Sequence, residues 1–414
     1  MQQLTSVFSA GNTFARYWLN FWFGALLVGF YCVTVGFFVF PSNSGIQSGF
    51  YSLVALPTAM ILIYQRPSQL NTKLFLLFLA APIYLAVSSF WADPNVADTY
   101  REPLFFLKLS LLLFLFFISI RLLFDRYQQF LEIWIYVFAI IGSVSALVGL
   151  VDYIIEHHAV LPARFPRFKG VIWGGDTNRV AAFYGIGFLA NLYLLNKGTL
   201  KFKIIAGLGL IPILMCILLA QSKAPLVMLG LAVLGFSATG LKRKNYLWLG
   251  ITLIIFSGIA AWLVFGNNTF ARSYSFFIRG EIWSKALEQL GDQWFWGAGL
   301  NYRVNLIADG TTFGQAHNLL IDAMRFGGVV VVTLLSAQIL CALYLYISRI
   351  QLTALNIFLL AWFLTGLATA LVEAQQPLIR PSYIWLLYWI PLALIYQNSK
   401  FSRKASDSTC RELE

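Results

Sequence analysis

The sequence has few of the residues on which soluble enzymes and metalloproteins rely. Among 414 residues it contains four cysteines, three histidines and 17 acidic residues. Cys32, Cys216 and Cys341 lie inside apolar runs, and Cys410 lies near the end of the chain. Their spacing indicates neither a disulfide framework nor a zinc site. The sequence also lacks a G-x-x-x-x-G-K-[ST] segment, so nothing in it indicates nucleotide binding by a P-loop.

Basic residues exceed acidic ones and give the chain a net charge of +12. They are spread along loops rather than gathered in one basic domain, and no nucleic-acid-binding motif accompanies them. We therefore expect no nucleic-acid partner and look for another reason for the positive charge.

Apolar residues make up 59% of the sequence, and the mean hydropathy is +0.74. Runs of about 17–25 apolar residues, each long enough to cross a bilayer, recur from one end to the other. We predict an all-α polytopic membrane protein with about twelve transmembrane helices. They form a single domain over residues 1–400, and a short cytoplasmic tail follows at 401–414. The predicted spans are 18–40, 48–64, 73–90, 104–120, 130–152, 179–195, 203–220, 224–240, 246–265, 318–347, 353–372 and 382–397.

Alternate loops differ in charge. One set is short, basic and nearly free of acids, which predicts that it faces the cytoplasm together with both termini. The opposite set includes the loop at 153–178 and the large interval at 266–317, between spans nine and ten, and among its basic residues arginine outnumbers lysine. Guanidinium groups bind phosphate through a two-point fork, so we expect this external face to hold phosphate. Pairing with external acids or anionic headgroups is the alternative. Charge at the end of an apolar span is costly and tends to be functional. Such residues are Arg179, Lys223, Arg325 and Glu373.

The 266–317 interval carries its own pattern. From Arg279 to Leu290 apolar residues recur at helical spacing, which predicts an amphipathic helix at the outer interface. Gly297 and Gly299 then permit a tight turn. The interval ends at His317, at the mouth of the next span. Its imidazole is suited to act as a general base near neutral pH, although a histidine here would equally suit a helix cap.

Several motifs, in this order, resemble the O-antigen ligase and polymerase superfamily. They are Asp176-x-Asn178, Gln221-Ser222-Lys223, Arg279-x-x-x-Trp283, Gly297-x-Gly299-Leu300, His317-Asn318 and Gly327-Gly328. The resemblance covers most of the chain as topology, and specific residues at about 170–180, 220–225 and 279–328.

The resemblance implies a GT-C-like membrane fold in the bacterial inner membrane. It also implies glycosyl transfer at the periplasmic face from an undecaprenyl-diphosphate-linked O-antigen donor, without metal or other cofactor. In the ligase branch the acceptor is a sugar of lipid A-core, and the product is complete lipopolysaccharide. The family's essential histidine falls on His317 and its R-x-x-x-W arginine on Arg279. Lys223 stands where the family usually has arginine, which leaves a single-charge contact in place of a fork.

These residues suit an inverting displacement. His317 would accept the proton of the attacking sugar hydroxyl, and Arg279 would stabilise the departing diphosphate. Further residues predicted to bind the diphosphate are Lys223, Arg179, Arg303 and Arg325. Residues predicted to support the site are Trp283, Asn318, Asp322, Glu373, Asp176 and Asn178.

Four other functions stay open at this point. Glu281 and Asp309 are the carboxylates that a glycoside hydrolase would use, although nothing in the sequence sets their separation. An O-antigen polymerase and a protein O-oligosaccharyltransferase would share the donor site. A transporter of the same lipid-linked glycan would also use arginines, but several spans carry no charge inside.

Overall fold

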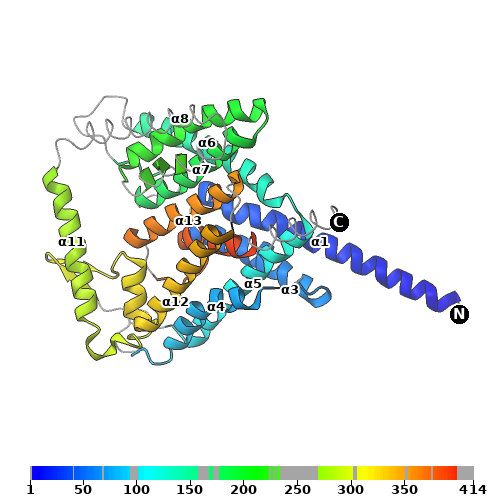
Figure 1. The fold of residues 1–414 in the computed structure, drawn as a ribbon, viewed down its shortest axis with the longest axis horizontal. Coiled ribbons are helices and arrows are strands. Elements are labelled where there is room, and N and C mark those ends of the chain that lie inside the picture. Colours follow the sequence, from blue (N-terminus) through cyan, green and yellow to red (C-terminus); the bar gives the residue numbers. More distant parts are fainter. Residues whose placement is uncertain are drawn as a thin grey trace.

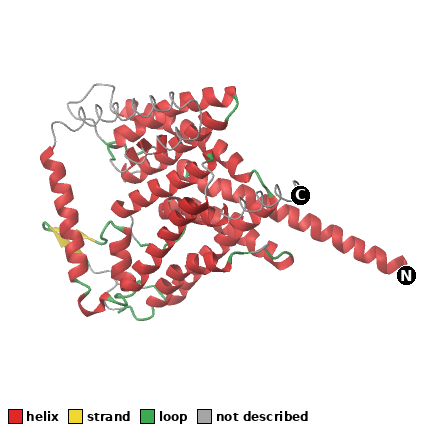
Figure 2. Cartoon of the chain, viewed as in Figure 1, coloured by secondary structure: helices red, strands yellow, loops and turns green. Residues whose placement is uncertain are grey.

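The computed structural model describes residues 2–40, 42–67, 70–93, 101–156, 167–170, 177–222, 269–301, 305–349, 353–373 and 376–398, with short pieces between 225 and 233. Helices dominate these residues (Figure 2). They are α1 (Gln2–Val39), α2 (Asn43–Phe50), η1 (Tyr51–Ala55), α3 (Leu56–Tyr64), α4 (Thr72–Ser88), α5 (Pro103–Arg126), α6 (Phe130–Glu156), α7 (Thr177–Lys197), α8 (Leu200–Ala220), α11 (Thr269–Glu288), η3 (Gly291–Trp294), α12 (Leu319–Arg349), α13 (Ala354–Glu373) and η4 (Trp385–Trp389), the last within a helical stretch at 383–398.

Seven helices of the described part are long and apolar enough to cross a membrane. They are Ala15–Val39, Asn43–Tyr64, Pro103–Arg126, Phe130–Glu156, Leu200–Ala220, Leu319–Tyr346 and Ala354–Glu373. This confirms a largely helical, polytopic membrane protein. The count of twelve stays a prediction, because 246–265 lies outside the described residues and 224–240 lies mostly outside them. Helices α4, α7 and the stretch at 383–398 occupy three further predicted spans.

The helices pack into one bundle (Figure 1). Helix α7 contacts α6, α8 and α13, while α4 contacts α5 and α12. Inside the bundle the rings of Trp134 and Trp362 stack 4.8 Å apart at 12°. Helix α1 extends from one side of the bundle, and α11 lies at the opposite end. The membrane orientation of these two ends stays a prediction.

The predicted amphipathic helix is part of α11, and protein covers part of its apolar face. Ile282 and Ala286 are buried against Leu306 and Ala308, which belong to a two-stranded antiparallel sheet. Strand β1 (Leu306–Ala308) pairs with β2 (Thr311–Phe313). The sequence analysis did not predict this hairpin. Leu287, on the same side of α11, is 47% exposed, so the predicted contact of this helix with the membrane interface stays a prediction.

A break in α12 receives the glycine-rich turn. Gly328 has φ +62° and ψ −162°, which no helix adopts. Its break leaves two carbonyl groups of the helix open, and the turn uses them: Ala298 N donates to Arg325 O (2.9 Å) and Gly299 N donates to Phe326 O (3.0 Å). A Cβ on Gly328 would collide with the Phe295 carbonyl. The glycines of both motifs thus dock the segment after α11 onto the bundle.

Candidate functional site

The carboxylate of Glu373 joins three helices that are far apart in the sequence. Glu373 ends α13 and its side chain is 7% exposed. Its Oε1 accepts hydrogen bonds from Arg279 Nη2 of α11 (2.6 Å) and from Asn178 Nδ2 of α7 (2.5 Å). The structure therefore brings together three of the predicted site residues.

His317 adjoins the other oxygen of the same carboxylate. Its Nδ1 lies 3.8 Å from Glu373 Oε2 and 3.4 Å from Gln315 Nε2. The cap of α12 belongs to the next residue, because Asn318 Oδ1 accepts from the backbone N–H groups of Leu320 (3.0 Å) and Ile321 (3.2 Å). The His317 imidazole therefore does not cap this helix. Its side chain is 28% exposed and lies beside Glu373.

The peptide preceding His317 is held from two sides. Trp283 Nε1 of α11 donates to Ala316 O (2.9 Å). Asp322 accepts from Ala316 N through Oδ1 (3.0 Å) and Oδ2 (3.2 Å). His317 itself has φ +53°, a left-handed conformation that is costly for a residue with a side chain. The two clamps on Ala316 support this conformation, and the catalytic-site role predicted for Trp283 and Asp322 stays a prediction.

Arg325 lies apart from the exposed part of the cluster. Its Nη1 donates to Asp322 Oδ1 (3.1 Å), and both side chains are only 1% exposed. The sequence analysis predicted that Arg325 binds a diphosphate. The structure instead places this guanidinium in the interior, beside the carboxylate that holds the Ala316 peptide.

A second layer of contacts surrounds Glu373 and Asn178. The Arg179 guanidinium lies 4.0 Å from the centroid of the Tyr383 ring, and the Tyr383 hydroxyl donates to Glu373 O (3.2 Å). Arg167 Nη2 donates to Asn178 Oδ1 (2.9 Å). Sequence reasoning counted Arg167 only among the arginines of the face predicted to hold phosphate, and it assigned no role to Tyr383. The signal for Arg167 was its place in a loop predicted to be external, which several other arginines share.

The remaining predicted residues fall in two groups. Lys223, Arg303 and Asp176 lie outside the described residues. The side chains of Glu281 and Asp309, the carboxylates of the hydrolase alternative, are exposed.

The cluster combines an anion-binding group with a proton acceptor. The Arg279 side chain is 31% exposed although one of its nitrogens contacts Glu373. A guanidinium has five N–H donors, so the Glu373 contact leaves donors for an anion. The His317 imidazole lies next to it on the same carboxylate. The arrangement therefore suits transfer of a proton beside a bound phosphate.

The chain was compared with known proteins. No family model matches it. Over 397 residues, however, it is 25% identical to a curated protein named "O-antigen ligase" from Pseudomonas aeruginosa, and the match covers 92% of this chain and 94% of the relative. The predicted resemblance to an O-antigen ligase is confirmed. Because the similarity to this O-antigen ligase covers 92% of the chain, it includes α7, α11 and α13, which supply the residues around Glu373.

Proposed function

We propose that this protein is an O-antigen ligase. It transfers an O-antigen glycan from undecaprenyl diphosphate to a sugar hydroxyl of lipid A-core, at the periplasmic face of the bacterial inner membrane. The observation that carries the proposal is the convergence of Arg279 and His317 on opposite oxygens of Glu373. The similarity to a named O-antigen ligase over most of the chain supports it.

Arg279 binds the diphosphate of the donor in this proposal. Glu373 fixes one end of the guanidinium, which lowers the entropy lost when the remaining N–H groups bind phosphate oxygens. Arg179 lies on the ring of Tyr383, whose hydroxyl donates to Glu373 O, and adds positive charge near the site. Lys223 and Arg303 remain candidates for further phosphate contacts, while Arg325 supports the fold around Asp322.

His317 acts as the base. Because the Glu373 carboxylate faces Nδ1, we assign the ring proton to Nδ1, which leaves Nε2 to accept a proton. In this tautomer the Gln315 amide turns its oxygen toward Nδ1. The acceptor hydroxyl oxygen attacks the anomeric carbon of the donor glycan and its proton passes to Nε2. The bond from that carbon to the diphosphate oxygen breaks, and the electron pair leaves with the lipid diphosphate beside Arg279. A single displacement inverts the anomeric centre, and cleavage of the diphosphate linkage supplies the driving force.

The test is a transfer assay with the purified full-length protein, an undecaprenyl-diphosphate-linked glycan and lipid A-core, in the presence of EDTA. We expect glycan on lipid A-core in amounts that EDTA does not reduce. A parallel reaction supplies a second lipid-linked glycan as the acceptor. Chain extension on that acceptor alone would assign an O-antigen polymerase, and failure with both acceptors would reject glycosyl transfer.

A further inference from the structure

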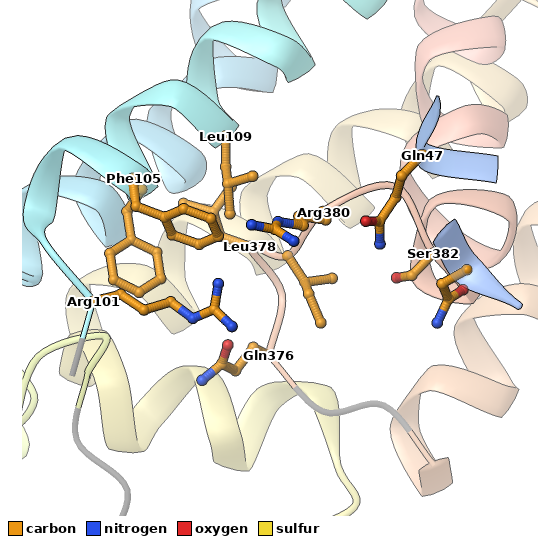
Figure 3. Close-up of a pocket in the computed structure, with 11 residues that line it drawn as sticks. Gln47, Arg101, Phe105, Leu109, Gln376, Leu378, Arg380 and Ser382 are labelled. Carbon is orange, nitrogen blue, oxygen red and sulfur yellow. The ribbon is translucent and has the colours of Figure 1, made fainter. Parts of the chain in front are cut away.

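A cavity of about 230 Å³ lies at the start of α5. Its walls come from α2, from residues 101–109 and from the segment 376–382 that leads from α13 to the last helix (Figure 3). The lining residues are Asn43, Gln47, Arg101, Phe105, Phe106, Leu109, Gln376, Leu378, Ile379, Arg380 and Ser382. None of these eleven has a carboxylate, and neither Arg279, His317 nor Glu373 is among them.

Two arginines are held close together in this cavity. The guanidinium carbons of Arg101 and Arg380 lie 4.5 Å and 5.0 Å from the centroid of the same ring, that of Phe105. Figure 3 shows both side chains extending toward one central space, with the Gln376 amide next to Arg101. Guanidinium groups bind phosphate oxygens through paired N–H donors. Two of them facing one space therefore suit an anion.

Neutral polar groups complete the lining. The Ser382 side chain is 3% exposed, and its Oγ has no hydrogen-bond partner among the described residues. Asn43 Oδ1 is likewise buried without a partner in the described part of the chain. Buried polar atoms are normally paired. Here a phosphate oxygen would accept from the Ser382 hydroxyl, and a sugar hydroxyl would donate to Asn43. The unsatisfied groups thus match a phosphorylated sugar.

The cavity adjoins the candidate site but remains distinct from it. Arg101 N donates to Asn301 Oδ1 (3.2 Å) and Asn301 Nδ2 donates to Arg101 O (2.6 Å), which joins the cavity to the segment after α11. Ser382 lines the cavity, while the next residue, Tyr383, contacts Glu373. One short segment therefore contributes to both places.

We propose that this cavity is a second phosphate-binding subsite, for a phosphorylated sugar in the headgroup of a membrane lipid. Its volume suits a phosphoryl group with part of a sugar, because sites that enclose a whole drug-sized ligand have about 300–1,000 Å³. The apolar side chains of Leu104 and Leu111, on one face of α5 beside it, are 73% and 54% exposed. Hydrocarbon chains of the same lipid would cover this face. If the proposed function holds, the acceptor lipid is the substrate that occupies the subsite, since Arg279 holds the donor.

The experiment measures lipid binding to the full-length protein in detergent by native mass spectrometry. The probes are lipid A-core with its phosphates, the same lipid after phosphatase treatment, undecaprenyl diphosphate, and inorganic phosphate. We expect wild-type protein to prefer phosphorylated lipid A-core over the phosphatase-treated form by about tenfold or more, which corresponds to about 1.4 kcal/mol. The double variant Arg101→Gln, Arg380→Gln should abolish this preference. Ser382→Ala, which removes one hydroxyl donor and leaves both guanidinium groups, should reduce it by about threefold.

Arg66→Gln is the matched control, because Arg66 is an exposed arginine in the connection between α3 and α4. It should leave the preference intact. If the double variant instead binds undecaprenyl diphosphate more weakly than the wild type, the subsite belongs to the donor. If the wild type binds inorganic phosphate as well as it binds lipid A-core, the assignment to a lipid is overturned. Equal binding of both lipid A-core forms, or a double variant like the wild type, would refute the subsite. Binding needs no catalysis, so a preference without glycan transfer would reject only the proposed function.

Discussion

The two arginine–carboxylate pairs at the α11 end of the molecule differ in their access to solvent. Arg279 and Glu373 belong to different helices, and the Arg279 side chain is 31% exposed. Arg325 and Asp322 lie three residues apart on α12, and each side chain is 1% exposed. Both pairs have similar contact distances, 2.6 Å and 3.1 Å. The chemical type of a contact therefore does not separate a substrate-binding pair from a structural one.

The other partners of each carboxylate also differ between the two pairs. Asp322 directs its second contact to a backbone N–H, that of Ala316. Glu373 directs its contacts to side chains, those of Asn178 and Arg279, and lies beside His317. We infer that the buried Arg325–Asp322 pair, called the closed pair below, stabilises the fold. The partly exposed Arg279–Glu373 pair, called the open pair, serves catalysis. This inference is tested below by variants that should act mainly on activity or mainly on stability.

The largest effect is expected from His317→Ala. Loss of the general base should reduce glycan transfer by about 10²–10⁴-fold, as measured in the reconstituted assay. The thermal unfolding temperature should stay near the wild-type value, because the nearest polar contacts of the imidazole are long, at 3.4 Å and 3.8 Å. Gln315→Ala is the neighbouring control and should retain most activity. Transfer by His317→Ala at a tenth of the wild-type rate or more would contradict the role of base.

Asp322→Ala should act on stability. It leaves the Arg325 guanidinium buried without its carboxylate, which costs about 3–5 kcal/mol in comparable pairs. We expect a much lower unfolding temperature and less protein in the membrane. Replacing both partners with leucine removes the unpaired charge and should recover part of the loss. Wild-type stability of the single variant would show that the closed pair is not structural.

Glu373→Gln should affect activity more than stability. The amide keeps the shape and an acceptor for Asn178, but it loses the charge that holds Arg279 and faces His317. A hydrogen bond to a charged group contributes about 1.5–3 kcal/mol, which corresponds to about 10–100-fold in transfer. The unfolding temperature should change less than in Asp322→Ala. A reversed order of these two stabilities would break the comparison between open and closed pairs.

Gly328→Ala should destabilise the docking of the external turn. A side chain at positive φ costs about 1–2 kcal/mol, and contact with the Phe295 carbonyl adds to this. Gly280→Ala is the matched control, because a Cβ on this helical glycine meets nothing within 4 Å. Thermal unfolding should separate the two variants, with Gly280→Ala at or above the wild-type temperature, since alanine favours a helix. Equal behaviour would argue against the role of the break.

The smallest effect is expected from Lys285→Gln on the exposed side of α11. The Lys285 ammonium donates to Glu288 (2.9 Å) and holds the pKa of that carboxyl below its usual value, with a further contribution from Ser284. A lowered pKa stabilises the fold above the unfolded-state pKa, and this contribution is lost as the pH falls through the folded-state value. Because the pair is solvent-exposed, neither transfer nor the unfolding temperature at neutral pH should change measurably.

Individual residues of the site were easier to predict than their contacts. Arg279 and His317 stood out through their motifs, and Glu373 through its charge at the end of a span. Their convergence depends on the packing of α7, α11 and α13, which no local pattern records. Arg325 was misleading because its i, i+3 spacing from Asp322 was visible but its burial was not.

The fold was likewise predictable where the signal is local in the sequence, and unpredictable where it depends on packing. Long apolar runs predicted most of the described helices within a few residues, because hydrophobic length is written directly in the sequence. The β1–β2 hairpin was missed, since strands of three residues are too short to display an alternating pattern. The cavity beside Phe105 was also beyond reach, because Arg101 and Arg380 come from distant segments.

Helix α11 has a mechanical consequence for the site. Arg279 contacts Glu373, and Trp283, one helical turn later, holds the Ala316 carbonyl next to His317. The separation between the proposed phosphate-binding group and the base is therefore set by the pitch of a single helix. Small rotations of neighbouring membrane helices, as a lipid passes between them, would shift both groups together and preserve their alignment.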